Sequence, residues 1–232
     1  DIIIDSGKFY TSYGNAYWTL SFSGTLTVSS DNSYLDLPNY TASQRPVWEK
    51  YKDRIISVKF VSINQIGDYT FYGYNALKSV DFGTVTKVCS YAFANCSSLE
   101  SIFIGNDSDY ITICQNAFYA CSSLKEVAFP YNTTVEGNAF AGCSQLEKIY
   151  ITTYSDYGAY PISATSNSFN GVTATVYLPA KWVNIRDYGD FGGNLSWKEA
   201  AYGPCGTYAF WMYDEGTSTI TITGTGAIQS HS

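Results

Sequence analysis

Apolar and polar residues recur in a short unit along the middle of the chain. Phenylalanines mark successive copies of the unit at 71, 93, 118, 140 and 169, at spacings of 22, 25, 22 and 29 residues. Six residues after each of the first four phenylalanines comes a leucine, which begins the pattern Leu-x-x-(Val/Ile)-x-(Phe/Ile). Alternation with period two is typical of a short strand that buries one face. The pattern predicts strands at 77–82, 99–104, 124–129 and 146–151.

Two further segments fit the same alternation. IISVKF at 55–60 precedes the first predicted strand by 22 residues, and ATVYLP at 174–179 follows the last one in a degenerate form. A unit of 20 to 30 residues cannot bury its apolar face alone, so successive units must stack and share a core. The sequence therefore predicts a solenoid in which six strands lie in parallel. The segments around each phenylalanine are expected to form turns or short helices on the convex side.

Four copies of the unit resemble the BspA-type leucine-rich repeat family. They read QIGDYTFYGYNALKSVDF, VCSYAFANCSSLESIFI, ICQNAFYACSSLKEVAF and VEGNAFAGCSQLEKIYI. The resemblance covers about residues 55–180, with Cys89, Cys114 and Glu136 where the family usually has glycine, and Tyr74 in place of its cysteine. It implies an α/β-type repeat solenoid, with parallel strands on the concave face. It also implies a bacterial or protist surface protein that adheres to host or neighbouring cells.

Two similar hairpins flank the repeats. Residues 14–29 and 206–224 each read as two strands around a turn, and Trp18 aligns with Trp211. The expected organisation is a hairpin cap module at 1–50, a leucine-rich repeat solenoid at 51–185, and a linker with the start of a second hairpin module at 186–232. A cap would cover the apolar edge of the first turn. The second hairpin is expected to lead into another repeat array.

Composition limits the possible functions. The chain has 232 residues, 45% hydrophobic and 14% charged, which suffices for a continuous core. A net charge of -7 opposes binding to nucleic acid or anionic lipid, and no apolar run is long enough for membrane insertion. The single histidine, His231, lies next to the end, so schemes that need an internal imidazole are excluded. We expect no enzyme and no cofactor.

Five of the six cysteines fall into two repeat positions. Cys96, Cys121 and Cys143 share one position, while Cys89 and Cys114 share another. Stacked cysteines on neighbouring turns point the same way, which disfavours unstrained disulfides. Buried free thiols are the favoured interpretation, and disulfides or a metal site are the alternatives. Cys205, in the second hairpin, is a candidate for a bond to another module.

The outward positions of the predicted strands carry two patterns that make the concave face the candidate binding surface. The residue after each repeat leucine alternates in charge from copy to copy, at Lys78, Glu100, Lys125 and Glu147, and the adjacent position alternates at Glu126 and Lys148. The alternative interpretation is a charge ladder that only confers solubility. Another outward position carries aromatic residues toward the C-terminal side, at Phe103, Tyr150 and Tyr177. These rings are expected to form a contact patch for protein or glycan, and the alternative is that flanking loops cover them. The candidate binding residues are Lys59, Asp81, Phe103, Tyr150, Tyr177, Lys78, Glu100, Lys125 and Glu147.

Acidic pairs offer a weaker candidate. Asp107 with Asp109, and Asp187 with Asp190, could supply carboxylates for a glycosidase or for calcium, but solvated turns are the favoured interpretation. The sequence as a whole favours a non-enzymatic extracellular or cell-surface recognition module that binds a macromolecule. A carbohydrate-binding module and a structural spacer in a longer surface protein are the alternatives.

Overall fold

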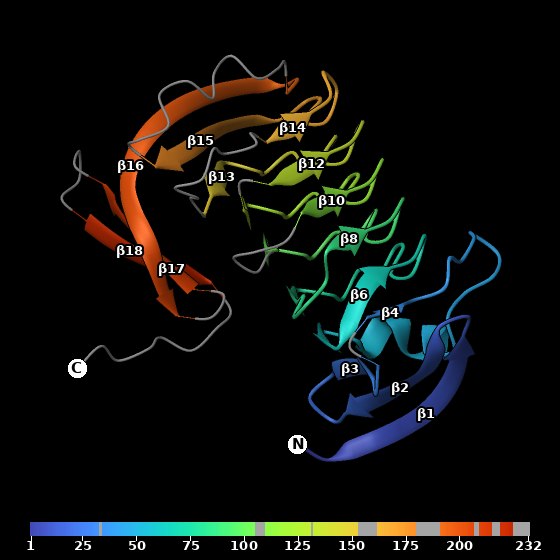
Figure 1. Ribbon diagram of the computed structural model, residues 1–232. Coiled ribbons are helices and arrows are strands. Elements are labelled where there is room, and N and C mark those ends of the chain that lie inside the picture. Colours follow the sequence, from blue (N-terminus) through green and yellow to red (C-terminus); the bar gives the residue numbers. More distant parts are fainter. Residues whose placement is uncertain are drawn as a thin grey trace, which may run out of the picture.

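The computed structural model is a curved solenoid with a small antiparallel module at each end (Figure 1). The structure describes residues 1–32, 34–104, 110–130, 132–152, 162–179, 191–206, 209–214 and 219–224. All six predicted strands are present and run in parallel. They are β5 (Ser57–Val61), β7 (Ser79–Asp81), β9 (Ser101–Phe103), β11 (Glu126–Phe129), β13 (Lys148–Ile151) and β15 (Thr173–Pro179).

Pairing along this sheet follows the repeat register. Val127 of β11 pairs with Ile102 of β9 and with Ile149 of β13, so equivalent residues of successive units are neighbours. Between β7 and β9 the strand pairing is interrupted, although the Glu100 N–H donates to the carbonyl of Lys78 at 3.2 Å. The six strands therefore belong to two consecutive sheets, one with β5 and β7 and one with β9, β11, β13 and β15, which we together call the first sheet. The inward residues of each strand are buried, and the outward ones lie on the opposite face.

A second parallel sheet, which the sequence did not predict, runs through the same turns. In Figure 1 its strands stack along the arc. They are β4 (Leu35–Asp36), β6 (Ile63–Ile66), β8 (Lys87–Val88), β10 (Ile111–Ile113), β12 (Thr133–Val135) and β14 (Ser163–Ala164). Strands of two to four residues are too short to show an alternation that separates them from a loop. Each solenoid turn therefore contributes one strand to each sheet.

The expected helices on the convex side are absent from the described residues, where the one helical element is η1 (Glu49–Arg54), a 3₁₀ helix before the first repeat. Tight turns replace them. Two residues before the phenylalanine the backbone is left-handed, as at Tyr69 and Asn116, and two residues after it the same holds at Gly73, Asn95 and Ala120. These reversals interrupt any helix, because a right-handed helix needs negative φ throughout. Of the predicted turns or short helices on the convex side, the described residues show the turns and not the helices.

Ala120 offers a test of this backbone. Its φ of 58° lies where an L side chain is strained by about 1–2 kcal/mol, and Gly142 occupies the same position in the next turn. Ala120→Gly is expected to raise the free energy of unfolding by about 0.5–1 kcal/mol, since the relief exceeds the extra flexibility of glycine in the unfolded chain. Urea denaturation measures the change. Ala117→Gly, at a fully buried position with ordinary φ, should instead lower stability by about 1 kcal/mol.

A column of phenylalanines forms the centre of the core. Consecutive rings from turn to turn lie 5.0 to 5.4 Å apart between centroids, with interplanar angles of 3° to 7°. All five rings are fully buried: Phe71, Phe93, Phe118, Phe140 and Phe169. The spacing is slightly larger than the separation of neighbouring strands, about 4.8 Å, so the repeat distance of the sheets brings the rings of successive turns into stacking contact.

The predicted hairpins are three-stranded in the structure. The first module consists of β1 (Ile3–Thr11), β2 (Gly14–Ser21) and β3 (Thr25–Ser30), and β3 pairs in parallel with β5. At the other end, β16 (Asn194–Gly206) pairs in parallel with β15 and then antiparallel with β17 (Ala209–Asp214), which pairs with β18 (Thr219–Gly224). The first module thus continues the sheet of β5 and β7, and the second continues the sheet of β9 to β15.

Candidate functional site

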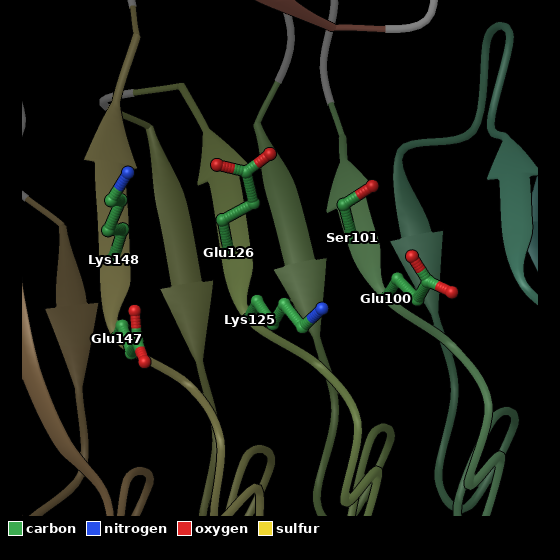
Figure 2. Close-up of a pocket in the computed structure, with 6 residues that line it drawn as sticks. All are labelled: Glu100, Ser101, Lys125, Glu126, Glu147 and Lys148. Carbon is green, nitrogen blue, oxygen red and sulfur yellow. The ribbon is translucent and has the colours of Figure 1, made fainter.

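The charged strip lies on the outward face of the strands in the middle of the first sheet. We use this name for two neighbouring rows, one just before the strands and one at their first residues. The rows are Lys78, Glu100, Lys125 and Glu147, then Ser101, Glu126 and Lys148. Figure 2 shows the side chains of all of these residues except Lys78, and they come from adjacent turns of the sheet. The parallel register thus brings residues separated by 22 to 25 positions in sequence next to each other.

Six residues of the charged strip line a shallow pocket of about 290 Å³, and they come from three consecutive turns (Figure 2). They are Glu100, Ser101, Lys125, Glu126, Glu147 and Lys148. Glu126 pairs in register with Lys148, while Lys125 stands between Glu100 and Glu147. Charges of opposite sign therefore alternate in both directions across the sheet. Such a surface can accept several charged groups of a partner at fixed spacing.

Backbone bonds hold this alternation rigidly. The Lys125 N–H donates to the carbonyl of Glu100 at 2.9 Å, and the Glu147 N–H donates to that of Lys125 at 2.9 Å. The side chains of Glu100, Lys125 and Glu147 are exposed. The strip thus combines a fixed backbone with side chains that reach solvent, as a preorganised contact surface requires.

The N-terminal candidates occupy the same sheet. Lys59 of β5 pairs with Asp81 of β7, and Lys59 Nζ lies 3.9 Å from Asp81 Oδ2. Lys78 is exposed one turn before Glu100. Lys59 and Asp81 lie outside the six pocket residues, so the structure divides the predicted set into a central group and a flanking ion pair.

The aromatic row differs from the exposed patch that was considered at this position. Phe103 is 8% exposed and Tyr150 is fully buried; with Ala128 they form a small cluster separate from the main core. Tyr177 packs on Tyr150, with ring centroids 5.2 Å apart. Side chains at the same position of neighbouring parallel strands come into contact, as Tyr150 does with Tyr177 and Phe103 does with Ala128. Phe103 and Tyr150 are therefore buried rather than exposed, while Tyr177 is half-buried.

Sequence reasoning left three pocket residues out of the candidate set, namely Ser101, Glu126 and Lys148. Their inclusion could have been predicted, because they lie two residues before Phe103, Ala128 and Tyr150. Residues two apart in a strand point to the same face. The acidic pairs Asp107/Asp109 and Asp187/Asp190 lie outside the described residues. In the part of the chain that is described, no cluster of three or more metal-ligating side chains occurs. The same part holds no helix long and apolar enough to cross a membrane.

The five repeat cysteines are buried free thiols, as the sequence favoured. Three form a ladder in which each Sγ donates to the carbonyl of the phenylalanine one turn earlier: Cys96 to Phe71 at 3.2 Å, Cys121 to Phe93 at 3.1 Å and Cys143 to Phe118 at 3.2 Å. Each thiol thus satisfies a carbonyl that faces the core. The side chain of Cys205 lies outside the described residues.

Thiol reactivity should follow this burial. Burial raises the pKa of Cys96 to about 12 and also raises the pKa of Cys121, so neither forms the reactive thiolate at pH 8. In a Cys205→Ser background, we expect the three ladder thiols to react with an aromatic disulfide reagent only as fast as the protein unfolds. Mass spectrometry of labelled peptides measures this. Rapid labelling of Cys121 in the native protein would contradict the prediction; Cys89 and Cys114, 5% and 6% exposed, serve as comparison.

Solved structures with a similar fold are leucine-rich repeat proteins and a pneumococcal antigen. A leucine-rich repeat protein from T. pallidum is 16% identical over 81% of this chain and 96% of its own, with a TM-score of 0.48. The pneumococcal vaccine antigen PcpA is 12% identical over 78% of this chain and 46% of its own, with a TM-score of 0.49. A leucine-rich repeat protein from Eubacterium ventriosum is 18% identical over 84% and 73%, with a TM-score of 0.43.

A search of the curated proteins finds no match. The family comparison is positive: the sequence model of the BspA type leucine rich repeat region matches six copies over residues 50–173, which is more than half of the chain. The matched range contains the parallel strands β5 to β13 and ends at Thr173, where β15 begins. The chain therefore belongs to the BspA-type leucine-rich repeat family.

Proposed function

We propose that this chain is a recognition module of a surface protein, which binds an extracellular partner protein through the charged strip. One observation carries the proposal: exposed charges of alternating sign stand at fixed spacing around a pocket on a rigid sheet. Repeat solenoids commonly use an extended sheet face for binding. Alternating charges favour a partner with a complementary pattern and disfavour one with uniform charge, which gives specificity and fast association.

Family membership supports the location. BspA-type repeats are associated with surface proteins, and one of the similar folds belongs to a vaccine antigen. A role in adhesion to a host or neighbouring cell is part of this proposal. Leucine-rich repeat solenoids generally act as interaction scaffolds rather than enzymes, which agrees with the absence of an internal imidazole in the sequence.

The carbohydrate alternative has less support. Sugar recognition by stacking needs an accessible ring face, and Tyr150 and Phe103 are buried. Tyr177 is the half-buried aromatic that remains in the row. A spacer role predicts no saturable binding by the folded chain.

The proposal is tested by charge reversal. Purified chain is applied to arrays of extracellular-matrix proteins and of glycans, together with the variant Lys125→Glu/Lys148→Glu. The control Arg54→Glu/Lys87→Glu changes the net charge equally at positions away from the strip. We expect saturable, salt-sensitive binding to a protein, weakened by about tenfold or more in the strip variant and unchanged in the control.

Other results would overturn the proposal. Equal loss in both variants would indicate a net-charge effect without a site. Binding to a glycan that is lost in Tyr177→Ala but kept in Lys125→Glu/Lys148→Glu would support the carbohydrate alternative. No binding by a chain that circular dichroism shows to be folded would favour the spacer.

A further inference from the structure

The two end modules are two copies of one structure. In the first, Gly7 of β1 pairs with Trp18 of β2, and Trp18 pairs with Val28 of β3. In the second, Gly203 of β16 pairs with Trp211 of β17, and Trp211 pairs with Ile222 of β18. The glycine at Gly7 is required by close packing, because a Cβ there would lie 2.6 Å from Nε1 of Trp18. This shared register assigns the residues of one module their equivalents in the other, except at the bulges between Ile3 and Asp5 and between Pro204 and Gly206.

The outer edge of the third strand differs between the copies. Leu26 of β3 pairs with Val58 of β5, the first strand of the repeat array, and Leu26 is fully buried. Two residues before the strand partner of Trp211 lies Ile220 of β18, which is the equivalent of Leu26. Ile220 is 64% exposed, and among the described residues β18 pairs with β17 only. The position that an array covers in one copy is therefore open in the other.

The outer edge of the first strand differs in the opposite sense. Residues 198–200 of β16 pair in parallel with β15, the last strand of the array. With the bulge between Ile3 and Asp5 taken into account, their equivalents in the first module are residues 1–3, of which Ile2 and Ile3 have exposed fractions of 75% and 52%. Each copy thus contacts a repeat array along one edge and exposes apolar residues along the other. A module that used both its first and its third strand in this way would join the last strand of one array to the first strand of the next.

We propose that the outer edge of β18 is a docking site for the first strand of a second BspA-type repeat array. The occupant is a parallel strand with the alternation of β5, whose valine equivalent to Val58 would cover Ile220. The precedent is internal: β5 continues the sheet from β3, and Ser57 Oγ donates to Thr25 Oγ1 at 2.9 Å across that junction. An added strand would also continue the sheet beyond β18, which among the described residues pairs with β17.

The test uses a chain extended at the equivalent point. Gly224 of β18 corresponds to Ser30 of β3, so a copy of residues 31–206 is joined directly after Gly224 to present a second array without its own cap. In the control, a copy of residues 1–206 is joined through a flexible linker, and its own β3 covers its first strand. Hydrogen exchange of the peptide 219–224 is measured by mass spectrometry in both fusions and in the 232-residue chain.

We expect exchange in residues 219–224 to slow by about tenfold or more in the first fusion only. Ile220→Asp should leave the thermal midpoint of the 232-residue chain unchanged, because Ile220 is exposed there, and should abolish the protection in the fusion. Unchanged exchange in the first fusion, or an appended array that folds only with its own β1–β3, would overturn the proposal. So would concentration-dependent oligomers of the 232-residue chain that protect β18, since the occupant would then be a second copy.

Discussion

Phe118→Ala is expected to lower the free energy of unfolding by about 3–5 kcal/mol, the largest effect of any single substitution considered for this chain. The ring is fully buried in the middle of the phenylalanine column, 5.4 Å from Phe93 and 5.3 Å from Phe140 between centroids. It also meets Phe82 edge-on at 6.4 Å. Alanine would lose all three ring contacts and leave a cavity between two turns that the rigid sheets cannot close.

The consequence should extend beyond the lost contacts. Each unit of a solenoid contacts only its neighbours, so cooperativity depends on the interfaces between turns. Weakening the central interface is expected to divide the urea transition of the wild-type chain into two steps, one for the turns before Phe118 and one for those after it. Tyr119→Ala removes an exposed ring at the next position and should change stability by less than about 0.5 kcal/mol. Equal effects of the two substitutions would contradict the prediction.

The strands of the first sheet could be predicted because their signal is local. Alternation in a segment such as 124–129 needs only a few residues, and its recurrence fixes the parallel register. The second sheet had no such signal, since β8 contains two residues. The left-handed positions were partly visible: Gly73 and Gly142 follow their phenylalanines by two residues, a place where glycine permits positive φ. Ala120 adopts the same φ without that signal.

The candidate site was predictable to a similar extent. Its charged rows follow from the register, because the repeat spacing aligns Glu100, Lys125 and Glu147. The burial of Tyr150 does not follow, because it depends on Tyr177, which is 27 residues away and in the degenerate last copy of the repeat. Whether an outward-facing residue is buried depends on the side chains of neighbouring strands, so it cannot be predicted from the sequence of one strand.

Arg45→Met is expected to lower the free energy of unfolding by about 2–3 kcal/mol, because Arg45 caps the backbone edge of the first turn. Within the solenoid, the N–H groups of one turn donate to carbonyls of the next: Gly73 N–H donates to the carbonyl of Ala94 at 2.8 Å. The carbonyl of Tyr72 is the equivalent of that of Ala94 but has no preceding turn. Arg45 Nη2 donates to it at 2.8 Å, and Nη1 donates to the carbonyl of Tyr69 at 2.7 Å.

A carboxylate holds the guanidinium in this position. Arg45 Nη2 lies 3.2 Å from Glu49 Oε2, which also accepts a hydrogen bond from the Tyr74 hydroxyl at 2.8 Å. Methionine would keep the apolar stem and remove the donors, leaving two carbonyls without a donor and the Glu49 carboxylate with only the more distant Lys52, whose Nζ lies 3.9 Å from Oε1. The guanidinium side chain is only 14% exposed, so water cannot fully replace it.

Two controls separate the cap from its charge. Arg45→Lys keeps the charge but cannot donate to both carbonyls from one planar group, so it should recover less than half of the loss. Arg54→Met removes an exposed cation of the same kind and should change stability by less than about 0.5 kcal/mol. Urea denaturation, with hydrogen exchange of residues 69–74, measures the effect: faster exchange there in Arg45→Met would localise the loss to the first turn. A wild-type midpoint in Arg45→Met would mean that the edge carbonyls are satisfied by solvent, and that the solenoid needs only its apolar cap.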